Sequence, residues 1–178
     1  LTSEYVKNVV TAMNNQRIGS VLKHFPGYGN NLDTHMGMAY DNRDFDTFVN
    51  NDFLPFISGI NAGAGAVLVS HNIVTSMDEN YPASLSPEIN RVLRQDLNFN
   101  GVIMTDDLSM KAIQNYTGNS DAAVLAVLAG NDLICSTNFE EQIPAVINAV
   151  KNGVISVERL NQSVLRILLW KHELGIIN

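Results

Sequence analysis

The segment from Lys23 to His35, with the sequence KHFPGYGNNLDTH, concentrates chemically capable groups on one stretch of chain. It holds two histidines, a lysine and an aspartate among glycines and a proline, directly after the apolar run 18–22. Asp33 and His35 could form a pair in which the carboxylate orients an imidazole that titrates near about 6.5 and moves protons at neutral pH. The same spacing fits an Asx-turn beside an exposed histidine, so both interpretations stay open.

Lys23 and His24 stand where the apolar run gives way to this polar segment. At such a position both side chains could donate hydrogen bonds to hydroxyls or carboxylates of a ligand. A buried, hydrogen-bonded histidine next to a salt-bridged lysine explains the same two residues equally well.

Asp106 and Asp107 follow the apolar run GVIMT. Successive side chains of a strand point to opposite faces, so one carboxylate is expected to face a cleft while its neighbour points elsewhere. A carboxylate in a cleft can act as a nucleophile, a base or a metal ligand. The alternative is that both cap a following helix that starts near Ser109; we favour chemistry for Asp106 and capping for Asp107.

The elements that must position these residues alternate along the chain. Four short apolar runs are typical of buried parallel strands, at 19–24, 65–70, 101–105 and 132–136. Helical periodicity predicts helices before, between and after them, at 3–13, 44–62, 86–97, 121–129, 139–151 and 157–172. This alternation predicts an α/β fold of TIM-barrel-like (β/α) units with about four parallel strands.

The residues that follow parallel strands gather at one edge of the sheet or barrel. The four predicted strand ends bring together lysine, histidine and carboxylate side chains, because they read Lys23-His24, Ser70-His71, Thr105-Asp106-Asp107 and Ser136-Thr137. We expect His71 to be structural rather than chemical, and His172 to lie on a surface helix.

Local signals support several of the predicted helix ends. Ser86 precedes Pro87 and suits an N-cap with proline at the first helical position. Thr137 and Glu140 have capping-box spacing, and Gly153 suits a helix stop.

Composition indicates one soluble globular domain: 178 residues, 46% hydrophobic and 16% charged. The net charge of -7, with scattered Lys and Arg, argues against a nucleic-acid partner or an anionic membrane surface. No apolar run reaches the roughly 18 residues of a membrane span. The single Cys135 excludes an intrachain disulfide and is predicted to be a small core residue. Because the chain starts at Leu1 inside a predicted helix, we expect a processed or truncated product.

Two motifs resemble those of glycoside hydrolase family 3, in its bacterial β-N-acetylglucosaminidase (β-hexosaminidase) type. KHFPGYGNNLDTH resembles the loop signature of that family, and GVIMTDDLSM resembles its nucleophile strand. The segments SHNIV, PASLSP and RILLWKHELG are similar as well, so the resemblance covers essentially the whole chain.

The resemblance implies a role for each matching residue. Asp106 would be the catalytic nucleophile, His35 the general acid/base and Asp33 its partner, while Lys23 and His24 would bind the sugar. Family members of this type remove terminal β-linked N-acetylglucosamine, often from peptidoglycan fragments, with retention of configuration and without a metal or other cofactor. Tyr28 and Asn30 depart from the family loop, which usually carries a second histidine and an aspartate at these positions.

The catalytic domain of the family resembles a (β/α)8 barrel, a fold that typically needs about 250 residues. Four predicted strands therefore indicate the second half of such a barrel over residues 1–178. The missing half, from a longer chain or from a homodimer partner, is expected to cover the exposed sheet edges.

Two other functions stay open. One is a non-catalytic half-barrel or sugar-binding module. The other is a metal-dependent barrel hydrolase with ligands among His24, His35, His71 and Asp106.

Overall fold

A parallel three-stranded sheet forms the centre of the computed structural model, which describes residues 1–29, 37–117 and 119–178. The strands are β1 (Val21–Phe25), β3 (Ala66–Val69) and β5 (Val102–Thr105), in the spatial order β1-β3-β5. Most residues of β3 and β5 are buried, as expected for strands with helices on both sides. The α/β fold of TIM-barrel-like units is therefore confirmed.

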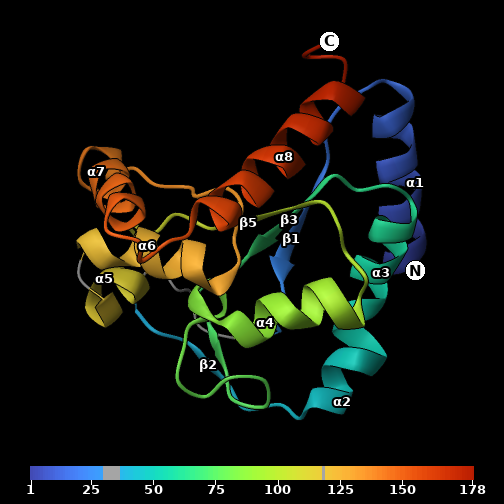
Figure 1. Ribbon diagram of the computed structural model, residues 1–178. Helices are drawn as coiled ribbons and strands as arrows, with labels where there is room; N and C mark the ends of the chain where they lie inside the picture. Colours follow the sequence, from blue (N-terminus) through green and yellow to red (C-terminus); the bar gives the residue numbers. More distant parts are fainter. Residues whose placement is uncertain (30–36, 118) are drawn as a thin grey trace.

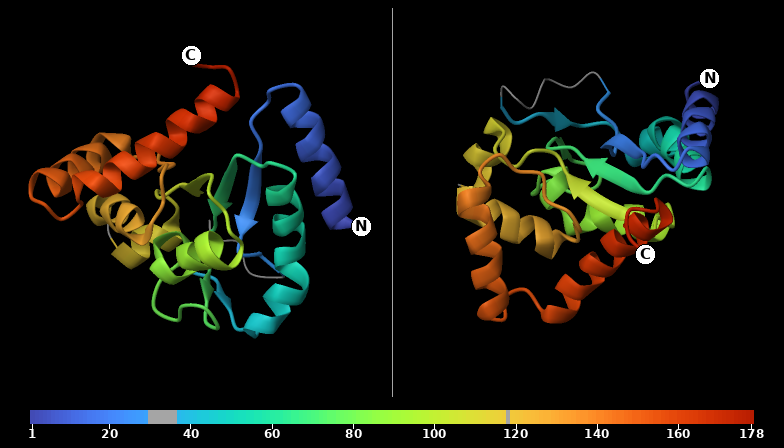
Figure 2. Two further views of the ribbon diagram at one scale, coloured as in Figure 1. Left: turned by 45° about the vertical axis from the view of Figure 1, so that its right-hand side comes forward. Right: turned by 90° about the horizontal axis from the view of Figure 1, so that it is seen from above.

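Helices surround this sheet in the described part of the chain (Figure 1). The α-helices are α1 (Thr2–Asn15), α2 (Phe45–Thr47), α3 (Phe53–Asn61), α4 (Pro87–Arg91), α5 (Lys111–Thr117), α6 (Asn119–Ala129), α7 (Phe139–Lys151) and α8 (Val157–Glu173). Three short helices of other types lie next to these α-helices. The π-helix η1 (Phe48–Asp52) joins α2 to α3, the 3-10 helix η2 (Ala83–Leu85) precedes α4, and the π-helix η3 (Val92–Asp96) follows α4. Both views in Figure 2 place α1 and α7 at opposite ends of the sheet. None of the described helices is long and apolar enough to cross a bilayer.

The fourth predicted strand, at 132–136, is wrong in extent. The segment does lie beside β5, where Leu133 N donates to Ile103 O and Thr105 N donates to Leu133 O. Only one bridge, between Met104 and Leu133, has strand geometry. The ladder ends there because Cys135 N bonds to the Thr105 side chain instead of to the neighbouring backbone.

A second, unpredicted sheet pairs β2 (Tyr40–Asp41) with β4 (Ile73–Val74) in parallel. Each strand has two residues, which is too short for a periodic pattern in the sequence.

The predicted helix ends are partly confirmed. Ser86 Oγ accepts from Ile89 N with Pro87 at the first turn of α4, and Gly153, with a φ of 73°, follows the end of α7. The capping box of Thr137 and Glu140 is wrong, because α7 starts after Asn138. Asn138 caps nothing with its side chain and donates instead to Glu141 Oε2 at 2.7 Å.

The main core lies between the sheet and the helices α3 and α4. Phe25 at the end of β1 stacks on Phe53 and meets Phe56 edge to face, with ring centroids 5.4 and 5.2 Å apart. At the other end of the strands, Trp170 of α8 packs over Gly19 and Gly65. Helices α3 and α8 thus pack against the two ends of β1, the strand that carries Lys23 and His24.

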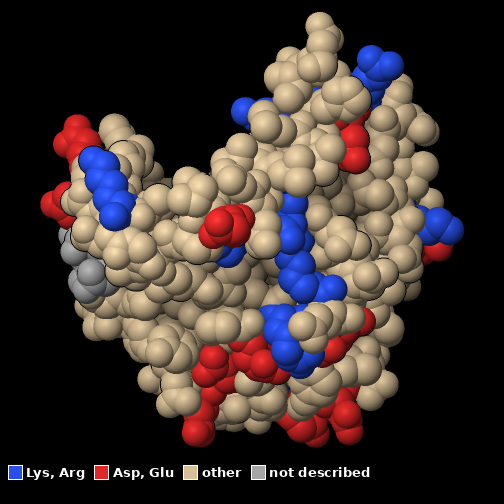
Figure 3. All heavy atoms as spheres, in the orientation of Figure 1, with Lys and Arg blue, Asp and Glu red and all other residues tan. Residues whose placement is uncertain are grey.

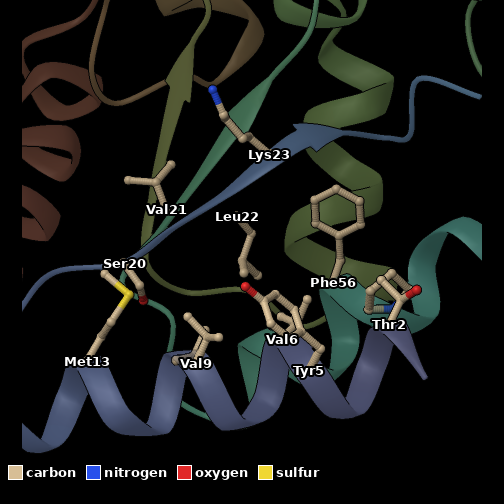
Figure 4. A pocket seen from close by; sticks show the side chains of 12 residues that line it. Thr2, Tyr5, Val6, Val9, Met13, Ser20, Val21, Leu22, Lys23 and Phe56 are labelled. Atoms are coloured by element: carbon tan, nitrogen blue, oxygen red, sulfur yellow. The ribbon is translucent and has the colours of Figure 1, made fainter.

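Among the described strands β1 is an edge, paired only with β3. An apolar groove of about 320 Å³ lies between β1 and α1 (Figure 4). Tyr5, Val9 and Val21 line it with side chains that are exposed to solvent.

Candidate active site

Asp106 stands at the carboxyl end of β5 with its side chain fixed on one side and open on the other. Its backbone N–H donates to Val69 O, which holds the residue against the end of β3. Its Oδ1 accepts from the backbone N–H of Asp107 at 2.9 Å. Of the Asp106 side chain, 27% is exposed. A carboxylate placed in this way is accessible to a bound molecule.

His24 lies opposite that carboxylate. Its Nε2 is 3.8 Å from Asp106 Oδ2, and 34% of its side chain is exposed. The ring also meets Tyr28 edge to face, at a centroid distance of 5.8 Å. The peptide bonds that flank this stretch, Lys23–His24 and Phe25–Pro26, are both cis. The structure thus brings the ends of β1 and β5 together, as the sequence predicts.

Lys23 precedes His24 on β1, and its side chain is exposed. Figure 4 shows this side chain pointing away from α1. Lys23 is also among the residues that line the groove between β1 and α1.

Asp107 and His71 make hydrogen bonds that hold the segments next to the strand ends in place. Burial by itself would raise the pKa of Asp107, but the hydrogen bonds donated by Ser109 N and Thr137 N lower it below the ordinary range. His71 is fully buried, with Nδ1 2.8 Å from Ser84 Oγ and Nε2 2.9 Å from Asp107 O. His71 is structural, as predicted. Asp107 stabilises the loop ahead of α5 rather than capping a helix at Ser109.

Asp33 and His35 fall within residues 30–36 and so lie outside the described residues. The distance between His35 and Asp106 stays a prediction.

A cluster of charged side chains, which packs against Gly27 and Gly29 at the start of the loop after β1, was not predicted from the sequence. Arg43 donates through Nε and Nη2 to Asp41 and through Nη1 and Nη2 to Asp52, at 2.8–3.1 Å. These hydrogen bonds, first of all those to Asp41, raise the pKa of Arg43 further. A side chain at Gly27 or Gly29 would overlap Asp52 or Arg43, so the loop packs directly on this cluster. The charge pattern D-N-R at 41–43 was visible, but its partner Asp52 lies a helix away.

Cys135 is half-buried. The prediction that it is a small core residue is therefore wrong. Burial and the nearby Asp107 and Asp106 carboxylates raise the pKa of its thiol, which disfavours the nucleophilic thiolate.

Within residues 1–29, 37–117 and 119–178, no three or more His, Cys, Asp or Glu side chains are placed to hold a metal ion. His71, one of the ligands considered for a metal site, has both ring nitrogens within 2.9 Å of protein atoms.

Comparison with known proteins adds to this geometry. Residues 1–169 match the family model described as "Glycosyl hydrolase family 3 N terminal domain". A protein named beta-hexosaminidase from Xanthomonas campestris pv. campestris (strain B100) is 30% identical over 169 residues, which are 93% of this chain and 51% of that protein. A beta-hexosaminidase of Hydrogenovibrio crunogenus is 34% identical over 158 residues, covering 86% of this chain and 44% of the relative.

A solved structure shows the same arrangement of elements. The family 3 beta-N-acetylglucosaminidase from Paenibacillus sp. str. FPU-7 aligns with a TM-score of 0.90 and 32% identity over 96% of this chain and 34% of that one. The chain spans about half the length of the curated relatives it matches.

Proposed function

This chain belongs to glycosyl hydrolase family 3, and we propose that it carries the catalytic nucleophile of an enzyme that removes terminal β-linked N-acetylglucosamine by a retaining mechanism. The substrate would be a peptidoglycan or chitin-type fragment. The names of the relatives support this choice of sugar, since they are β-hexosaminidases and a β-N-acetylglucosaminidase.

The position of Asp106 is the observation that carries the proposal. One carboxylate oxygen is fixed by the Asp107 amide, and the other lies 3.8 Å from His24 Nε2 at an open strand end. A nucleophile for an anomeric carbon needs this combination of fixed orientation and access.

The proposed reaction has two steps that use the same groups. Asp106 attacks the anomeric carbon while His35 gives its proton to the glycosidic oxygen, so that the C–O bond breaks and a glycosyl ester forms on Asp106. His35 then takes a proton from water, whose oxygen attacks the same carbon, releases the sugar and restores the carboxylate. Asp33 would hold the imidazole of His35 in the required tautomer. Lys23 and His24 would hold sugar hydroxyls.

We also propose that residues 1–178 form the second half of a (β/α)8 barrel. The open edge of β1, the apolar groove beside it and the roughly twofold greater length of the relatives support this domain assignment. The other half would close the barrel and complete the sugar pocket.

Hydrolysis of a chromogenic β-N-acetylglucosaminide tests the proposed function, with the anomer of the first-formed sugar read by NMR. The protein with its barrel completed, by a longer chain or by a second copy, should release the β-anomer. Asp106→Asn should lower kcat on the order of 1,000-fold or more. Asp46→Asn, on the exposed face of α2, removes one carboxylate elsewhere and should change nothing. Release of the α-anomer, or full activity in Asp106→Asn, would contradict the proposal.

The alternative is a non-catalytic half-barrel that only binds sugar. It predicts that residues 1–178 alone bind N-acetylglucosamine saturably without turning over the chromogenic substrate. Turnover by residues 1–178 alone would contradict this alternative.

A further inference from the structure

Four arginines line a hollow of about 230 Å³ between α4 with its extension η3 and α8. They are Arg91, Arg94, Arg159 and Arg166, and we call this site the arginine hollow. In Figure 3, blue Lys and Arg atoms run in a stripe between the positions that α8 and α4 have in Figure 1. Arg94 donates to Phe99 O and Gly101 O, just before β5 begins, so the hollow lies at the opposite end of this strand from Asp106.

Positive charge in the arginine hollow exceeds what the surrounding carboxylates neutralise. Asp132, whose side chain is fully buried, is shared by three guanidinium groups, at 2.5 Å from Arg94, 3.0 Å from Arg166 and 3.5 Å from Arg159. One carboxylate therefore faces three positive charges. Arg91 differs from these three, because Glu88 and Asp96 both pair with it.

The hydrogen bonds of these side chains show which donors are already used. Arg159 donates to Val127 O, Ser163 Oγ and Asn131 O, and Arg94 to two further carbonyls and Asp132. Arg166 donates through Nη1 to Asp132, and within the described residues its Nε and Nη2 have no acceptor. The Arg166 side chain lines the hollow and is 30% exposed.

The electrostatics of the cluster favour the binding of an anion. Burial, and then repulsion from Arg166 and Arg159, lower the pKa of Arg94 to about 10 although Asp132 acts to raise it. Burial, with repulsion from Arg166, also lowers the pKa of Arg159. A second anion beside these groups would relieve their mutual repulsion.

We propose that the arginine hollow binds a small oxyanion of the phosphate type. The planar guanidinium of Arg166 would hold two of its oxygens through Nε and Nη2. Gln95 and Gln162, which also line the hollow, would supply amide donors. The small volume favours a free ion or a single phosphate group over a larger organic ligand.

Titration of the protein with inorganic phosphate, at ionic strength held constant with chloride, tests the proposal by calorimetry or phosphorus NMR. The wild type should show saturable binding with one site per chain. Gln162→Glu places a carboxylate in the hollow without removing any member of the Asp132 network, and should weaken binding by at least about tenfold. Asn161→Asp is the matched control, since it adds the same charge to the neighbouring exposed position of α8 outside the hollow. Its phosphate affinity should equal that of the wild type.

Two further variants separate this site from the strand ends at Asp106. Arg166→Lys keeps the positive charge but loses the planar fork, and should weaken phosphate binding while the protein remains folded. Asp106→Asn should bind phosphate as the wild type does. Absence of saturable binding, equal effects of Gln162→Glu and Asn161→Asp, or loss of binding in Asp106→Asn would each overturn the proposal.

Discussion

Asp106 and Asp107 are identical in chemistry and adjacent in sequence, yet their surroundings give them different tasks. Asp106 keeps one oxygen at an open strand end near His24. Asp107 turns away, and its Oδ1 accepts from two backbone amides, those of Ser109 and Thr137. The alternation of side chains along a strand predicts this division, but not the two amides that Asp107 binds.

A pH-dependent stability is expected from Asp107. Its pKa is lowered in the folded protein, so its carboxylate stabilises the fold above the unfolded pKa of about 3.9, and this contribution is lost as pH falls through the folded value. Asp107→Asn should therefore be less stable than the wild type at pH 7, with a difference that shrinks below about pH 4. Urea unfolding at a series of pH values measures this, with Asp46→Asn as the control. A difference that does not change with pH would contradict the assignment.

His71 should matter for stability and for the position of Asp106. Replacing it by Phe leaves Ser84 Oγ without its buried partner, at a cost of about 1–3 kcal/mol, while Asp107 O still accepts from Met110 N. We expect His71→Phe to lower the free energy of unfolding by this amount and to lower kcat more than it changes KM. His172→Gln, at an exposed position of α8, should do neither. Wild-type stability in His71→Phe would show that the two contacts contribute nothing.

Residue types and their order were enough to predict the meeting of His24 and Asp106, because both lie at the carboxyl ends of strands of one parallel sheet. The cluster of Arg43, Asp41 and Asp52 could not be predicted in that way. Its geometry depends on β2, a two-residue strand, and on the turn into α2 that brings Asp52 back to Arg43.

At the scale of elements, Trp170 packs α8 against the amino ends of β1 and β3. The ring of Trp170 occupies the space that a side chain at Gly65 or Gly19 would need. The absence of a side chain at both positions therefore lets this ring approach the strands.

Gly65→Ala should destabilise the protein by about 1–3 kcal/mol, since a methyl group would overlap the Trp170 ring. The overlap disappears in a Trp170→Ala background. There, adding Gly65→Ala should cost less than it does in the wild type, and chemical unfolding of all four proteins gives the coupling. Equal costs in both backgrounds would mean that Trp170 does not pack on Gly65 in solution.

Long periodic segments were predicted well, and short ones were not. The helices at 139–151 and 157–172 have nearly the predicted bounds, because their apolar spacing persists over several turns. The strand at 132–136 reads as apolar, but its pairing is decided by the Thr105 side chain, which no local pattern encodes.

At the scale of the whole molecule, the edge of β1 that pairs with no other described strand is the surface that we expect to bind a partner. An unpaired strand edge beside an apolar groove favours association with another chain or segment.

Residues 1–178 by themselves should therefore associate, with a mass above the 19.5 kDa of the monomer in size-exclusion chromatography with light scattering. Val21→Lys, in the groove, should shift the population toward monomer. Val49→Lys, which replaces an exposed valine of η1 outside the groove, should not. A monomer at all concentrations in the wild type would count against an incomplete barrel.

The central claim is that Asp106 forms a covalent bond to the sugar. Its most direct test treats the active protein with a fluorinated N-acetylglucosaminide inactivator, which slows release of the glycosyl ester, and then maps the labelled peptide by mass spectrometry. The account predicts one sugar per protein, attached to Asp106. A label on any other residue, or turnover of the compound with inversion and without a label, would contradict it.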